Sequence, residues 1–254
     1  MEDAHMPRQA RERCESNIYH VMLRGVNRQQ IFEDEEDCAH FLEILAECKQ
    51  ISCFALYAYC LMGNHVHFLI KEQQEPLEQI MKRITTRYVY WFNVKYERSG
   101  HLFQDRFRSE PVENEQYLLT VLRYIHQNPI KAGICQAVAD YEYNSYREYV
   151  GTVRMIDTGF VYHHISPDEF VLMHSQLETT QCLDIEDREQ SPCVTDEQAR
   201  RIIEKHTKCT SASDFQRLDI ATRNKYLKLL KEHGLSIRQI SRLTGISFGI
   251  VSRV

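Results

Sequence analysis

The spacing of apolar residues predicts an alternation of strands and helices over the first half of the chain. Residues 19–24 show the loose alternation of apolar and polar residues that is typical of strands, and residues 54–62, 65–70 and 103–112 are predicted to form three further strands. Apolar residues recur instead at three and four positions, as in amphipathic helices, after Glu33, after Pro76 and after Glu115.

The order of these elements is strand, helix, strand, strand, helix, strand, helix, which predicts an α+β domain. A strand, a helix and two strands joined by a tight turn at Gly63-Asn64 are typical of the opening of a ferredoxin-like fold. We therefore expect a four-stranded antiparallel sheet over residues 17–128, with two helices on one of its faces.

Two histidines, His65 and His67, stand on the third predicted strand with Val66 between them. Alternate side chains of a strand point to the same face, so both imidazoles are expected to project together. Two imidazoles on one face suit a divalent cation. For a motif this short, a pair of half-buried polar residues without a ligand remains the alternative.

The third helix is predicted over residues 115–128, where apolar residues recur at spacings of four and three. Tyr124 and Asn128 lie one turn apart on a neighbouring stripe of this helix. Pro129 disfavours helical geometry at the residue before it, so the helix is expected to end there. A phenol, which can be a covalent nucleophile, thus stands beside an amide oxygen that can bind a hard cation.

Two motifs in this order, His65-Val66-His67 and Tyr124-Ile125-His126-Gln127-Asn128-Pro129, resemble those of the single-tyrosine HUH transposases, named for two histidines that flank a hydrophobic residue. The second motif is similar to that of the branch called REP-associated tyrosine transposases. In relatives outside that branch, a glutamine commonly stands at the place of Asn128. The resemblance extends over residues 7–150.

The resemblance implies cleavage and rejoining of single-stranded DNA at hairpin-bearing ends or repeats, through a 5′-phosphotyrosine intermediate. Tyr124 would be the nucleophile, and His65, His67 and Asn128 would hold one divalent cation, Mg²⁺ or Mn²⁺. Two alternatives stay open: a DNA-binding regulator whose HUH domain binds without cutting, and a domesticated nuclease acting on chromosomal repeats. Relatives act as monomers or as dimers, so a monomer or a homodimer is expected.

Basic residues near these motifs are candidate DNA contacts. Lys82, Arg83 and Arg87 lie on the second predicted helix, and a solvated helix face is the alternative for them. Arg106 and Arg108 lie two apart on the fourth predicted strand. The family resemblance makes these two arginines DNA contacts, whereas ion pairs with neighbouring carboxylates are the alternative.

The chain divides into three segments by periodicity and charge. Residues 1–150 are expected to form the HUH domain, and residues 151–194 an acidic connector with one short helix near residues 167–177. Residues 195–254 hold 12 Lys and Arg against 6 Asp and Glu. Only this last segment carries the basic surplus that phosphate contacts require.

Residues 235–254 resemble a helix-turn-helix of the resolvase or sigma-factor type, with Gly245 at the turn. Two further helices are expected before it, over residues 196–206 and 214–232. We expect this domain to bind duplex DNA, and a plain helical hairpin is the alternative. The candidate DNA contacts are Arg238, Arg242, Ser247, Ser252 and Arg253.

The overall composition is that of a soluble globular protein, with 43% hydrophobic residues and a net charge of −5. No apolar run approaches the roughly 20 residues that span a bilayer, and the polar N-terminus is not a secretory signal. Nine cysteines without a Cys-x-x-Cys pair argue for reduced thiols in the cytoplasm and against a zinc ribbon.

Overall fold

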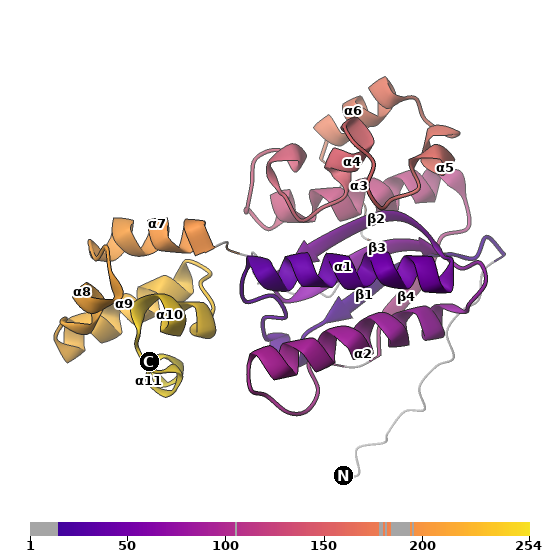
Figure 1. Ribbon diagram of the computed structural model, residues 1–254. Helices are drawn as coiled ribbons and strands as arrows, with labels where there is room; N and C mark the ends of the chain where they lie inside the picture. Colours follow the sequence, from indigo (N-terminus) through magenta and orange to yellow (C-terminus); the bar gives the residue numbers. More distant parts are fainter. Residues whose placement is uncertain (1–14, 105, 178–179, 181, 184–193, 195) are drawn as a thin grey trace, which may run out of the picture.

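A four-stranded antiparallel sheet lies at the centre of the first domain of the computed structural model, which describes residues 15–104, 106–177, 180, 182–183, 194 and 196–254 (Figure 1). The strands are paired in the order β2-β3-β1-β4. Their bounds are β1 (Ile18–Arg24), β2 (Ala55–Met62), β3 (His65–Lys71) and β4 (Arg108–Pro111). The predicted ferredoxin-like α+β fold is therefore confirmed, with a fourth strand shorter than expected.

Two helices, α1 (Glu35–Ser52) and α2 (Leu77–Lys95), pack against each other on one face of the sheet, as predicted. The acidic run before α1 caps it: the Asp34 side chain accepts the backbone N–H of Asp37, and the Asp37 side chain accepts that of Asp34. Phe41 of α1 stacks on Phe68 of β3, with ring centroids 6.1 Å apart. Phe68 thus points to the helical face, and its neighbours in sequence point away from it.

The opposite face of the sheet is covered by α3 (Glu115–Lys131), which packs against β2 and β3. The prediction that this helix ends at Asn128 is wrong, because it continues through Pro129 to Lys131. Pro129 has no N–H to donate, but the backbone N–H of Ala132 bonds to the Asn128 carbonyl, so helical bonding resumes after the proline.

Three short helices after residue 145 extend the layer formed by α3 (Figure 1). They are α4 (Tyr146–Val150), α5 (Thr158–Tyr162) and α6 (Pro167–Ser175). We expected a connector from residue 151, but Ile156, Val161 and Phe170 are buried in the first hydrophobic core. The short helix expected near residues 167–177 is α6, whereas α4 and α5, with five residues each, show too few turns for their periodicity to be recognised in the sequence. Residues 178–179, 181 and 184–193 of the expected connector lie outside the described residues.

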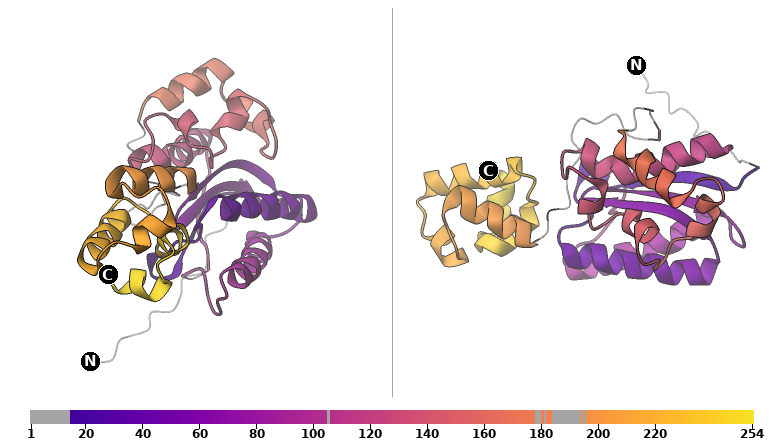
Figure 2. Two further views of the ribbon diagram at one scale, coloured as in Figure 1. Left: turned by 60° about the vertical axis from the view of Figure 1, so that its left-hand side comes forward. Right: turned by 90° about the horizontal axis from the view of Figure 1, so that it is seen from above.

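Five helices near the C-terminus surround a second, separate hydrophobic core (Figure 2). They are α7 (Asp196–Thr207), α8 (Ala212–Gln216), α9 (Ile220–Glu232), α10 (Ile237–Thr244) and α11 (Phe248–Arg253). The single helix expected over residues 214–232 is two helices, because the Asp219 side chain caps a new start at α9. Gly245 ends α10 with a φ of 69°, as the predicted turn requires. Among the described residues, no helix combines the length and apolarity needed to cross a membrane.

Candidate active site

His65 and His67 lie side by side on the face of the sheet that α3 covers. Their ring centroids are 5.1 Å apart, and the rings are inclined at 88°. On the adjacent strand β1, Arg24 is the register partner of His65 and Met22 is that of His67. Paired residues on neighbouring strands share a face, so all four side chains line the same surface.

Hydrogen bonding leaves one nitrogen of His65 available for a ligand. Its Nδ1 lies 2.7 Å from Oδ1 of Asn64, and an amide oxygen only accepts, so Nδ1 carries the proton. Burial lowers the pKa of His65 to about 4, with help from the charge of Arg24, and lowers the pKa of His67 well below its usual value. Both rings are therefore neutral at pH 7, the form in which imidazole binds cations.

Asn128 contributes an amide oxygen from α3. Its Nδ2 donates to the Tyr124 carbonyl at 3.0 Å, which leaves Oδ1 for another partner. Within the described parts of the chain, Oδ1 of Asn128 and Nε2 of both His65 and His67 are buried without a hydrogen-bond partner. Buried polar atoms are costly when they are left unpaired, and these two imidazole nitrogens and one amide oxygen fit a divalent cation.

Tyr124 lies against the histidines from α3. Its ring centroid is 6.0 Å from that of His67 and 5.9 Å from that of His20. The ammonium group of Lys131 lies 3.9 Å from the centroid of the Tyr124 ring, a position it reaches because α3 continues past Pro129. A positive charge this close stabilises negative charge that develops on the phenol.

Two other polar residues of α3 interact with residues outside the candidate site. The phenol of Tyr117 interacts with Glu110, and burial together with this carboxylate raises the pKa of Tyr117. His126 is hydrogen-bonded to His174 at 2.9 Å and to Ser145 at 2.8 Å. The role of His126 is therefore to attach α6 to α3, and Tyr124 is the tyrosine of this helix that contacts His67.

Two arginines share the face of the histidines, and only one of them was predicted. Arg108 on β4 is the register partner of Met22, which places it in the same row as His67. Arg24 was missed because its strand was interpreted only as part of the sheet. The signal that could have found it is alternation on β1, which places His20, Met22 and Arg24 on one face.

Two of the predicted cations of α2 form ion pairs within the chain. Arg83 lies 2.7 Å from Glu75, and Arg87 lies 2.8 Å from Glu47. The structure therefore does not bring Arg83 and Arg87 to the histidines.

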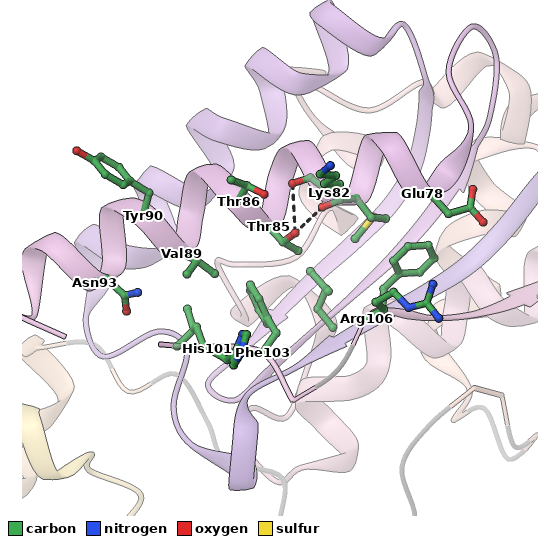
Figure 3. Close-up of a pocket in the computed structure, with 14 residues that line it drawn as sticks. Glu78, Lys82, Thr85, Thr86, Val89, Tyr90, Asn93, His101, Phe103 and Arg106 are labelled. Atoms are coloured by element: carbon green, nitrogen blue, oxygen red, sulfur yellow. Dashed lines mark hydrogen bonds between the residues drawn. The ribbon is translucent and has the colours of Figure 1, made fainter. Parts of the chain in front are cut away.

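Lys82 and Arg106 line a cavity of about 660 Å³ between α2 and residues 101–103, 106 and 107 (Figure 3). Leu23 also lines this cavity, and alternation along β1 places Leu23 on the opposite face from Arg24. The sheet therefore separates Lys82 and the cavity from Tyr124.

The two arginines of α10 contact the first domain. Nε of Arg238 lies 3.6 Å from Glu33, and the guanidinium of Arg242 lies 3.5 Å from Asp34 and is also paired with Asp196. Arg238 and Arg242 therefore connect the two domains. The other predicted DNA contacts of this domain are exposed on or next to α11: Ser247, Ser252 and Arg253.

A family model and a curated relative both match this chain, and both are named as transposases. Residues 14–128 match the family described as "Transposase IS200 like". A protein of Haemophilus influenzae named as a REP-associated tyrosine transposase is 28% identical over 109 residues, which cover 38% of this chain and 61% of the relative. The chain thus spans about three fifths of the length of this curated relative.

A solved structure shows the same fold. The structure of a REP-associated tyrosine transposase bound to a REP hairpin has a TM-score of 0.50 and 16% identity, and the match covers 57% of this chain and 86% of that chain. A transposase structure from Deinococcus radiodurans has a TM-score of 0.34 and 16% identity over 48% of this chain and 97% of its own.

Proposed function

Since residues 14–128 belong to the IS200-like transposase family, in its branch of REP-associated tyrosine transposases, we propose that this protein cleaves and rejoins single-stranded DNA at hairpin-bearing ends or repeats. The observation that carries the proposal is the position of Tyr124. Its ring contacts His67 on the face where the described residues leave Nε2 of both histidines and Oδ1 of Asn128 buried and unpaired.

The proposed reaction is an attack of the Tyr124 hydroxyl on a backbone phosphate. The bond from phosphorus to the tyrosine oxygen forms, and the bond from phosphorus to the 3′ oxygen breaks. The phenolic proton passes to a solvent water, and the departing 3′ oxygen takes a proton from water to become a free hydroxyl. The 5′-phosphotyrosine keeps the energy of the phosphodiester, so the reverse reaction rejoins a strand without ATP.

The neighbouring side chains have supporting roles in this proposal. His65, His67 and Asn128 would hold one Mg²⁺ or Mn²⁺, which polarises the phosphate when bound. Among the described residues, no three His, Cys, Asp or Glu side chains gather into a metal site, so the remaining ligands would be oxygen atoms of substrate or water. Such a set favours these hard cations over zinc. Lys131 would stabilise the phenolate, and Arg24 would contact a flanking phosphate.

A cleavage assay on hairpin-bearing single strands tests this function. We expect cleavage in Mg²⁺ or Mn²⁺ and none in excess chelator, with products resolved on a denaturing gel. The same strand annealed to its complement should stay intact, because duplex formation removes both the single strand and the hairpin. Binding without cleavage in every metal would instead support a DNA-binding regulator that does not cut.

We further propose that residues 195–254 bind duplex DNA through the exposed side of α11. The domain has its own core, so deleting it should leave cleavage of a short single strand intact. Duplex binding should weaken at least about tenfold, because the deleted segment carries the basic surplus. If the isolated segment shows no salt-dependent affinity for duplex DNA, it is assigned to protein contacts instead.

Two arginines of this domain provide a matched comparison. Arg253→Ala should reduce the slope of log affinity against log salt by about one, as expected for a lost phosphate contact. Arg238→Ala should leave this slope nearly unchanged, because Arg238 is paired with Glu33. Equal slopes for both variants would contradict the assignment of α11 as the DNA-binding element.

A further inference from the structure

His20 is a buried histidine on β1 to which the proposed reaction assigns no part. Its Nε2 lies 3.0 Å from Nδ1 of His67. Its Nδ1 has no hydrogen-bond partner among the described residues and lies 4.0 Å from Oε2 of Glu110 on β4. Glu110 is also its register partner. Glu110, His20 and His67 therefore form a series of polar side chains across three adjacent strands, in which His67 lies diagonally from His20 because Leu69 is the register partner of His20 on β3. The series ends at Nε2 of His67.

The hydrogen bond between the two rings allows two arrangements of its proton, and the negative charge of Glu110, which makes no hydrogen bond to Nδ1 of His20, favours one of them. A neutral imidazole carries a single proton, and the carboxylate favours that proton on Nδ1 of His20, the nitrogen that faces it. Nε2 of His20 then accepts, so the proton in the shared hydrogen bond belongs to Nδ1 of His67. His67 is left with an unprotonated Nε2 at the candidate site.

The same tautomer arises independently at His65, where Asn64 accepts the proton of Nδ1. Both histidines therefore present an unprotonated Nε2, although different neighbours hold their Nδ1 atoms. His20 itself is not a ligand in this arrangement, because one of its nitrogens carries the proton and the other accepts from His67.

We propose that His20, supported by Glu110, is a positioning residue that holds His67 in the tautomer needed to bind a divalent cation. This proposal depends on the proposed function in one respect, namely that His67 is a ligand of the cation. Partners that accept the second nitrogen of a metal-binding histidine fix its tautomer and ring orientation, and losing such a partner costs about 10–100-fold in metal affinity.

The tautomer of His67 can be measured without any metal, by long-range ¹H–¹⁵N correlation spectra of the full-length protein. We expect the proton on Nδ1 in both His65 and His67. In His20→Leu, His67 should become a mixture of tautomers while His65 stays unchanged. A proton on Nε2 of His67 in the wild-type protein would overturn the proposal, whether or not the protein binds a cation.

The affinity for Mn²⁺, measured by electron paramagnetic resonance or calorimetry, gives a second readout. His20→Leu should weaken binding about 10–100-fold, whereas His20→Gln, whose amide oxygen still accepts a hydrogen bond, should stay within about threefold of wild type. Val21→Ala is the control for damage to the core, because Val21 is equally buried and faces the other side of β1.

The outcomes of the affinity experiment separate the two hypotheses. Equal losses in His20→Leu and His20→Gln, or no loss in either, would show a packing role and overturn the proposal. If wild-type protein binds no Mn²⁺, the proposed cation function is contradicted instead, and the spectra still decide whether His20 sets the tautomer of His67.

Discussion

Replacing Tyr124 by phenylalanine is expected to abolish strand cleavage, with a loss of at least about a thousandfold in rate. The covalent protein–DNA adduct should disappear with it. The change removes one oxygen atom and keeps the ring that packs against His20 and His67. The fold and the affinity for single-stranded DNA should therefore remain, as measured by thermal unfolding and by a binding titration.

Tyr117→Phe is the matched control for this variant, because Tyr117 is the other tyrosine of the same helix, where it is half-buried and Tyr124 is buried. Its hydroxyl interacts with Glu110 rather than with the histidines, so cleavage should persist within a few-fold of wild type. Retained activity in Tyr124→Phe together with lost activity in Tyr117→Phe would assign the nucleophile to Tyr117, two turns earlier on α3. The family assignment would not change.

Replacing either His65 or His67 by alanine is the second change with a large expected effect. Each variant should lose at least about a hundredfold in cleavage rate, because a bound cation contributes several kcal/mol to stabilising the charge of the transition state. Affinity for Mn²⁺ should fall in parallel. Asn128→Ala should lose only about tenfold, since a water molecule can replace a neutral oxygen ligand.

Affinity for a single strand is the control for these variants, because the nucleic acid contacts a wider surface than the two imidazoles. It should change little in either histidine variant when measured in chelator. Full cleavage activity in His65→Ala or His67→Ala, or in wild-type protein with excess chelator, would remove the cation from the mechanism.

The placement of the two histidines could be predicted because it depends on strand alternation alone. The contact between His20 and His67 could not, because these residues are 47 positions apart and meet only through the register of β1 against β3. Alternation on β1 groups Arg24 with His20, but only the register of β1 against β3 places Arg24 beside His65. Local sequence patterns define which side chains share a strand face, but the pairing of distant strands decides which faces meet.

Two other differences between the sequence-based predictions and the structure come from tertiary packing. Lys131 reaches Tyr124 because α3 continues through Pro129, where local preference predicts an end. Arg238 and Arg242 are arginines of a predicted DNA-binding helix, yet both contact carboxylates near the start of α1. Neither the continued helix nor the domain contact leaves a periodic pattern in the sequence.

The most direct test of the account is the identity of the residue that carries the DNA. Wild-type adduct, trapped on a suicide substrate and digested with trypsin, separates the two candidate tyrosines of α3. Cleavage after Arg123 and Lys131 yields a peptide with Tyr124 as its single tyrosine, and cleavage after Arg108 and Arg123 yields one with Tyr117. Mass spectrometry should find the nucleotide on the peptide of residues 124–131, and finding it on residues 109–123 would contradict the account.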